Sequence, residues 1–158
     1  MEVRGNRGPG AVIVAAHGGS GASTLARALR IPESADGDGD GDGAGAVVVV
    51  VAARTTAQAA ERVIRTVAAI PEHQHVVLAL TEDAPLPLPS AVCAMRRLLA
   101  DRVAAVVVLP WQPRWRHERP SVATAQRRWT ARAVDLAAAV ADLTSPTAAV
   151  ADPQGALS

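Results

Sequence analysis

A glycine-rich turn lies between an apolar run and a helical pattern near the start of the chain. Residues 11–16 are apolar, and after His17 the sequence reads Gly18-Gly19-Ser20-Gly21-Ala22-Ser23-Thr24. Three glycines in four positions let backbone amides turn inward without interference from Cβ atoms, and the start of a helix adds partial positive charge. The spacing therefore predicts a loop that binds an anion such as phosphate, with the Ser23 hydroxyl placed to meet Mg²⁺.

The same residues have a second interpretation, in which the glycines only let a buried strand turn into a helix and no ligand binds. Phosphate-binding loops use a lysine, and this chain has none, because all 16 of its basic residues are arginine. Phosphoryl transfer needs positive charge on the transferring oxygens. We therefore expect that backbone amides can still bind an anion but that ordinary turnover is lost.

At this turn the sequence resembles the deviant Walker A ATPases of the ParA/MinD type, whose loop reads Lys-Gly-Gly-x-Gly-Lys-(Ser/Thr)-Thr. The matching residues are Gly18, Gly19, Gly21, Ser23 and Thr24. His17 and Ala22 stand where the family has its two lysines, and Ala16 replaces the first glycine of the general P-loop pattern. The resemblance implies ATP or GTP with Mg²⁺ as ligands, bound without hydrolysis. It assigns the nucleotide or phosphate site to His17, Gly18, Gly19, Ser20, Gly21, Ala22, Ser23 and Thr24.

A second, shorter likeness follows the last apolar run. ParA/MinD-type proteins end a late strand with Ile-Pro-x-Asp-Pro and a basic stretch near the adenine base. Pro110 and Pro113 match this pattern, and Gln112 replaces the aspartate. The resemblance implies a base pocket at Pro110, Trp111, Gln112 and Pro113. From the residues alone, either Trp111 or Trp115 stacks on a base, or the tryptophans fold back and close the end of the sheet.

Arginines gather in and after this loop. They are either a solvated surface or contacts for the phosphates of a nucleotide or nucleic acid. The net charge of +1 and the pI of about 8.1 provide no overall basic field for nucleic acid, so any such contact would be local. The residues concerned are Arg114, Arg116, Arg119, Arg127 and Arg128.

Alternating apolar runs and amphipathic helices position these motifs. Continuous apolar strands are expected at 11–16, 46–53, 76–80 and 104–109, with a helix after each. This pattern predicts an α/β three-layer sandwich with roughly four parallel strands, P-loop NTPase-like but truncated, because no Walker B strand ending in aspartate follows the first helix. The strand order stays open between 2-1-3-4, which places the glycine loop at a topological switch point, and a sequential order.

Polar residues are predicted to begin three of the helices. Thr55 with Gln58 forms a capping box, Ser90 caps the third helix, and Ser121 caps the longest one. In the third helix the predicted apolar face consists of Val92, Met95, Leu98, Leu99 and Val103.

The predicted domain spans 10–143, with a flexible N-terminus at 1–9, a flexible loop at 35–45 and a disordered tail at 144–158. The Gly/Asp run at 36–43 copies half of an EF-hand loop, but Val47 occupies the twelfth position, so we interpret the run as a solvated linker.

A single cysteine, Cys93, excludes an internal disulfide. No apolar run approaches the roughly 18 residues of a membrane span, and the first ten residues are too polar for a signal peptide. We expect a cytoplasmic protein with no membrane partner.

These observations together predict a degenerate ParA/MinD-like P-loop protein that does not hydrolyse nucleotide. It would bind a nucleotide or phosphate and act as an accessory or regulatory protein, with a protein partner or as a homodimer, in plasmid or mobile-element maintenance or transfer. One alternative is a reduced nucleotide hydrolase or kinase in which His17 or Arg54 replaces lysine. Another is a nucleic-acid-associated adaptor that uses the arginines named above.

Overall fold

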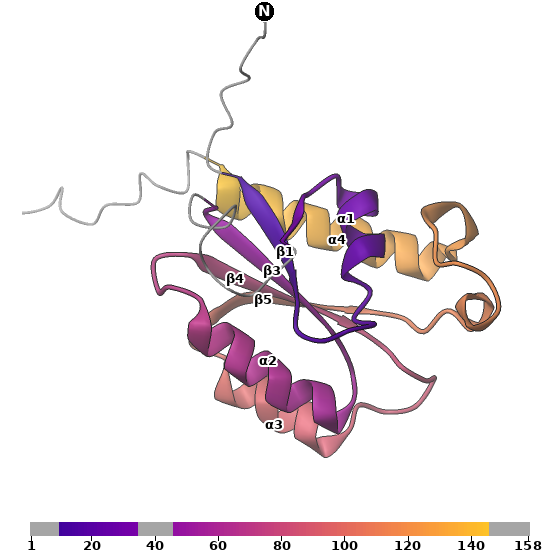
Figure 1. The fold of residues 1–158 in the computed structure, drawn as a ribbon, viewed down its shortest axis with the longest axis horizontal. Helices are drawn as coiled ribbons and strands as arrows, with labels where there is room; N and C mark the ends of the chain where they lie inside the picture. Colours follow the sequence, from indigo (N-terminus) through magenta and orange to yellow (C-terminus); the bar gives the residue numbers. More distant parts are fainter. Residues whose placement is uncertain (1–9, 35–45, 146–158) are drawn as a thin grey trace, which may run out of the picture.

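A single five-stranded parallel sheet with helices on both faces forms the fold (Figure 1). The computed structural model describes residues 10–34 and 46–145. The predicted flexible segments 1–9 and 35–45, and the predicted tail from residue 146 onward, lie outside these ranges. The strands are β1 (Ala11–Ala15), β2 (Glu33–Ser34), β3 (Val48–Arg54), β4 (His75–Thr81) and β5 (Val103–Leu109). The helices are α1 (Ala22–Leu29), α2 (Ala57–Ala69), α3 (Ser90–Leu98) and α4 (Arg127–Thr144).

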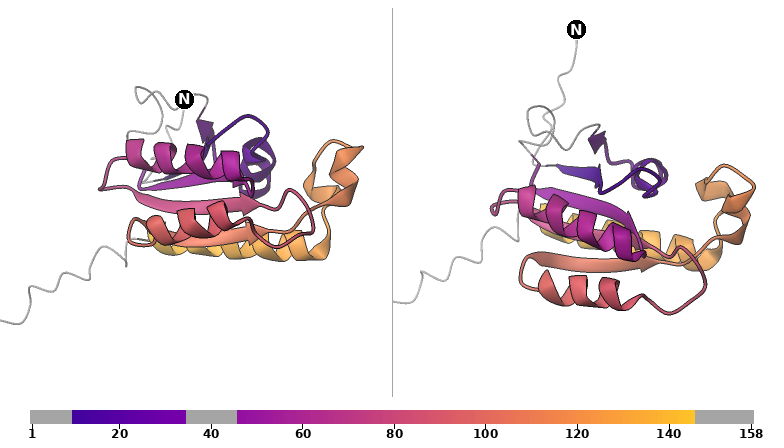
Figure 2. Two further views of the ribbon diagram at one scale, coloured as in Figure 1. Left: turned by 90° about the horizontal axis from the view of Figure 1, so that it is seen from below. Right: turned by 60° about the horizontal axis from the view of Figure 1, so that its bottom comes forward.

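Continuous apolar strands pair in parallel because both of their faces are covered. Helices α1 and α4 lie on one face of the sheet and α2 and α3 on the other (Figures 1 and 2). Residues 48–53 of β3 are all buried, and alternate residues of this strand face opposite helix layers. The predicted α/β class and parallel sheet are confirmed.

Strand β2 is the element that the sequence analysis missed. It is only two residues long, and it pairs with β1 through Glu33 beside Ile13 and Ser34 beside Val14. The four predicted strands do lie in sequential order, but β2 adds a fifth strand outside β1 and makes the order β2-β1-β3-β4-β5. Two polar residues after a proline carry no apolar signal, so only the pairing identifies them as a strand.

Two predicted helix caps are wrong by one residue, and the predicted start of the longest helix is wrong by several. The cap of α2 is Thr56, whose hydroxyl accepts a hydrogen bond from the Ala59 amide at 3.1 Å, and not Thr55. Helix α3 begins at Ser90, follows Pro89 and has no side-chain cap. Ser121 caps a short 3-10 turn (Val122–Thr124), and α4 starts after it at Arg127. For α2 and α4 the predicted cap hydroxyl is used elsewhere: that of Thr55 accepts from the Asp83 amide, and that of Ser121 accepts within the 3-10 turn.

The predicted apolar face of α3 is correct only in part. Val92, Met95 and Leu99 are buried, whereas the Leu98 side chain is 69% exposed and Val103 belongs to β5. Helix α3 is short and ends at Leu98, so Leu99 turns inward as the helix terminates.

Within the described ranges, no helix combines the length and apolar character needed to cross a bilayer.

Adjacent leucines at the end of α3 provide a matched test of this packing. Leu99→Ala removes a side chain that is 8% exposed and should lower the free energy of unfolding by about 2–4 kcal/mol through lost burial and cavity formation. Leu98→Ala should lower it by less than about 1 kcal/mol, because that side chain is already in solvent. Urea unfolding followed by circular dichroism measures both; equal losses would contradict the described end of α3.

Candidate functional site

The candidate site lies at the carboxyl ends of β1 and β3, where the chain leaves neighbouring strands in opposite directions. After β1 it turns to α1 on one face of the sheet, and after β3 it turns to α2 on the other face (Figure 1). In doubly wound sheets with this strand order, such a switch point opens a crevice in which ligands bind. The residues that line this crevice come from the glycine loop and from the cap and first turns of α2.

Left-handed backbone shapes the glycine loop. Gly19 and Gly21 have φ angles of 76° and 85°, and Gly21 is the residue that caps α1. Among the described residues, no group accepts a hydrogen bond from the amides of Gly18, Gly19 or Gly21. The buried Ser20 hydroxyl accepts from the Ala22 amide at 3.4 Å. The loop therefore has two left-handed glycines and amides without a partner among the described residues, which are features of anion-binding nests.

Residues 22–24 form the first turn of α1. The Ala22 side chain, at the position of the family's phosphate-binding lysine, is 3% exposed and packs in the core beneath the sheet. Only its backbone faces the loop, so this position offers no cation. Thr24 is half-buried in the same turn.

The predicted Mg²⁺ ligand, Ser23, donates a hydrogen bond to the Glu33 carboxylate at 2.9 Å. Glu33 is exposed on β2, so the short strand that the sequence analysis missed brings a carboxylate to the first turn of α1. A glutamate followed by a serine gives no recognisable motif in the sequence. No group of three or more histidine, cysteine, aspartate or glutamate side chains placed to hold a metal occurs in the described part of the chain.

His17 joins the glycine loop to the end of β3. Its Nε2 accepts a hydrogen bond from the Arg54 amide at 3.0 Å, and its Nδ1 lies 2.8 Å from the Gly18 carbonyl oxygen. A backbone amide can only donate and a carbonyl can only accept, so this arrangement assigns the proton to Nδ1 and makes the ring neutral. His17, which stands where the ParA/MinD-type loop has its first lysine, thus connects the glycine loop to the end of β3 through hydrogen bonds.

Arg54 also lies beside the loop, as the hydrolase alternative requires. Its Nε donates to the Gly19 carbonyl at 2.7 Å, and its Nη1 contacts Asp83 Oδ1 at 2.8 Å. A hydrogen bond from the Asp83 amide to the Thr55 hydroxyl, at 3.2 Å, fixes the position of Asp83. The two charged side chains are 50% and 44% exposed, so the pair contributes only about 0–1 kcal/mol. The Arg54 charge is close to the loop but is shared with a carboxylate.

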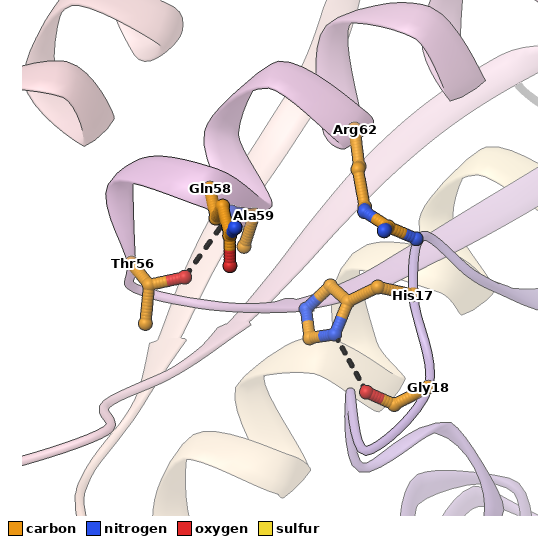
Figure 3. A pocket seen from close by; sticks show the side chains of 6 residues that line it. All are labelled: His17, Gly18, Thr56, Gln58, Ala59 and Arg62. Atoms are coloured by element: carbon orange, nitrogen blue, oxygen red, sulfur yellow. Dashed lines mark hydrogen bonds between the residues drawn. The ribbon is translucent and has the colours of Figure 1, made fainter.

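A pocket of about 200 Å³ opens between the loop and α2 (Figure 3). Arg62 extends from α2 toward the loop that carries His17, and none of the lining residues is acidic. The first turn of α2 also contains no acidic residue. The lining consists of His17, Gly18, Thr56, Gln58, Ala59 and Arg62.

In the predicted base pocket and just after it, Gln112 and Trp115 form contacts within the protein. Gln112 is 5% exposed; its Nε2 donates to the Trp111 carbonyl at 3.1 Å, and its Oε1 accepts from the Gln126 amide at 2.8 Å. Trp115 packs edge-on against the buried Trp129 with ring centroids 5.3 Å apart. Its indole N–H donates to the Thr124 hydroxyl. Trp115 therefore folds back onto the sheet end, whereas Trp111 and Pro110 are half-buried and Pro113 is exposed.

The arginines of the nucleic-acid alternative are spread over the loop after β5 and the start of α4. Arg114, Arg119, Arg127 and Arg128 are exposed, and in the described ranges none of these four forms an ion pair. They provide a solvated basic surface that lies apart from the residues lining the pocket.

A scan against protein-family models, a search of curated proteins and a search of solved structures each returned no match.

Adjacent glycines test whether the loop needs its left-handed backbone. Gly19→Ala places a Cβ on a residue with φ of 76° but meets no atom within 4 Å, so its cost is backbone strain alone. We expect a loss of about 1–2 kcal/mol in the free energy of unfolding. Gly18→Ala has the same open space without a positive φ and should change stability by less than about 0.5 kcal/mol. Chemical denaturation measures the free energy of unfolding of both variants. Equal stability of the two would show that the loop adopts another conformation.

Proposed function

We propose that this protein binds the phosphate groups of a ligand, a nucleotide such as ATP or GTP in particular, in the crevice between the glycine loop and α2, and that it does so without hydrolysis. The observation that carries the proposal is a single pocket at the switch point of the sheet that is lined by Arg62 and by Gly18, whose amide donates to no group among the described residues. Both groups attract anions, and no acidic side chain among the pocket's lining residues opposes them.

Arg62 is the cation best placed to take the role of the missing lysines. Arg54 is already bound to Asp83 and Gly19, whereas Arg62 forms no ion pair within the described residues. A guanidinium can also bind two phosphate oxygens at once. The side chain reaches the loop from α2, a helix whose contribution the loop motif does not predict.

Ser23 and Glu33 are placed to accompany such a ligand with Mg²⁺. In proteins this ion keeps several waters and commonly binds one or two carboxylates together with substrate phosphates. A hydroxyl and a carboxylate 2.9 Å apart beside the loop match these ligand types. When bound, the ion would neutralise phosphate charge, and Glu33 would hold it next to the first turn of α1.

Binding without turnover follows from the charges that the site lacks. Position 22 points its side chain into the core, and Arg54 shares its charge with Asp83, so neither presents a free cation to a transferring phosphoryl group. Such a protein would use ligand binding as a signal to a partner, which is the accessory or regulatory role that the ParA/MinD resemblance suggests for plasmid or mobile-element functions.

Two arginines of α2 provide a matched test of phosphate binding. We expect calorimetric titration to detect saturable binding of ATP, ADP or GTP in the unaltered protein and an affinity at least about tenfold lower in Arg62→Ala, because a charge-assisted contact is lost. Arg65→Ala removes the same charge from an exposed position of the same helix that does not line the pocket, and it should bind normally. Absence of binding at millimolar ligand, or equal losses in both variants, would contradict the proposal.

Glu33→Gln tests the magnesium component. Glutamine still accepts a hydrogen bond from Ser23 but loses the negative charge that attracts the ion. We expect Mg²⁺ to strengthen nucleotide binding in the unaltered protein and to have little effect in Glu33→Gln, while binding measured with chelator is the same in both. Release of inorganic phosphate is measured on the same samples; turnover that Arg54→Ala abolishes would instead establish the hydrolase alternative.

A further inference from the structure

The outer edge of β5 has backbone hydrogen-bonding groups that pair with no strand among the described residues. Within the described part of the chain, β5 pairs with β4 on one side and with no strand on the other. The carbonyl of Leu109 accepts from the Glu82 amide, which places it toward β4. Because successive residues of a strand alternate in direction, the backbone groups of Val106 and Val108 point away from β4.

This edge lacks the devices that keep sheet edges from pairing. Natural edge strands are commonly very short or carry charged residues or proline. The opposite edge, β2, has two residues, whereas β5 has seven and reads Val-Ala-Ala-Val-Val-Val-Leu. Val106 and Val108 are only partly buried. An unprotected apolar edge of this length is suited to receive an additional strand.

A groove of about 560 Å³ runs along the same edge between β5 and α3. Its apolar floor includes Leu78, Leu99 and Val106. On its helical side lie Arg96 and Arg97, both exposed, and neither forms an ion pair within the described residues. A strand added to β5 would therefore lie beside two free positive charges.

We propose that the β5 edge and this groove bind an extended segment of a partner protein in which acidic and apolar side chains alternate. The segment would add a strand to β5 through the backbone groups of Val106 and Val108. Acidic side chains on one of its faces would meet Arg96 and Arg97. This surface is independent of the phosphate crevice, which lies at β1 and β3.

Charge favours an acidic partner over a second copy of the chain. Helix α3 (Ser90–Leu98) contains no acidic residue, so the same edge of a second copy would bring a helix with two arginines and no complementary charge. A partner segment with alternating carboxylates provides that charge and disfavours wrong partners.

The test uses a fluorescein-labelled peptide of alternating valine and glutamate, titrated with the full chain and followed by anisotropy. We expect saturable binding, at least tenfold weaker in the double variant Arg96→Glu and Arg97→Glu. The matched control reverses two exposed arginines elsewhere, Arg27→Glu and Arg65→Glu, and should bind as the unaltered chain does. A peptide with lysine in place of glutamate should reverse this preference and bind the Arg96/Arg97 variant more tightly.

Val106→Pro tests the role of the edge itself. Proline removes an outward-facing amide and leaves the hydrogen bonds to β4 in place, so the variant should fold and lose peptide binding. Circular dichroism checks its fold. No binding of the acidic peptide, unchanged binding by Val106→Pro, or equal weakening by the control arginine pair would each overturn the proposal. Self-association in sedimentation that Val106→Pro abolishes and the Arg96/Arg97 variant does not would overturn it in favour of a second copy.

Discussion

Hydrogen bonding of β1 to a strand on each side is the constraint on which the candidate site depends. Pairing with β3 alone would leave β1 and its glycine loop at an edge of the sheet. The two residues of β2 complete the other side, and the loop then lies at a switch point with α1 and α2 diverging from it. The same pairing brings Glu33 to Ser23. A strand of two residues thus places the loop at the switch point and brings a carboxylate to the first turn of α1.

A second set of contacts ties the loop to the ends of β3 and β4. The His17 ring accepts a hydrogen bond from the Arg54 amide. The Arg54 side chain donates to the Gly19 carbonyl and to the Asp83 carboxylate, and the Asp83 amide donates to the Thr55 hydroxyl. These are exposed or partly exposed contacts of modest individual energy. Together they tie Arg54 to the loop and to Asp83, whereas Arg62 approaches from α2 and forms no ion pair within the described residues.

The two sheet edges differ in a way that bears on partners. β2 ends after two residues, whereas β5 is seven apolar residues long and lies beside Arg96 and Arg97, which form no ion pair among the described residues. The crevice lies toward the β2 side of the sheet and the open edge at the other end. The crevice proposed to bind phosphate and the edge proposed to bind a partner segment therefore do not overlap.

The apolar runs and the glycine turn by themselves determined the α/β class, the four long strands and the helix that follows each, because burial of continuous apolar segments on both faces leaves few other arrangements. They also predict that an anion binds at the glycine loop. The sequence could not identify β2, since Glu33 and Ser34 become a strand only by pairing with β1. It placed the α2 cap at Thr55, because it could not show that Asp83 already engages that hydroxyl. It included Leu98 in the core, because helical spacing does not reveal where α3 ends.

Arg62, Glu33 and the free edge of β5 emerged only from tertiary structure, because contacts between segments distant in sequence leave no local pattern.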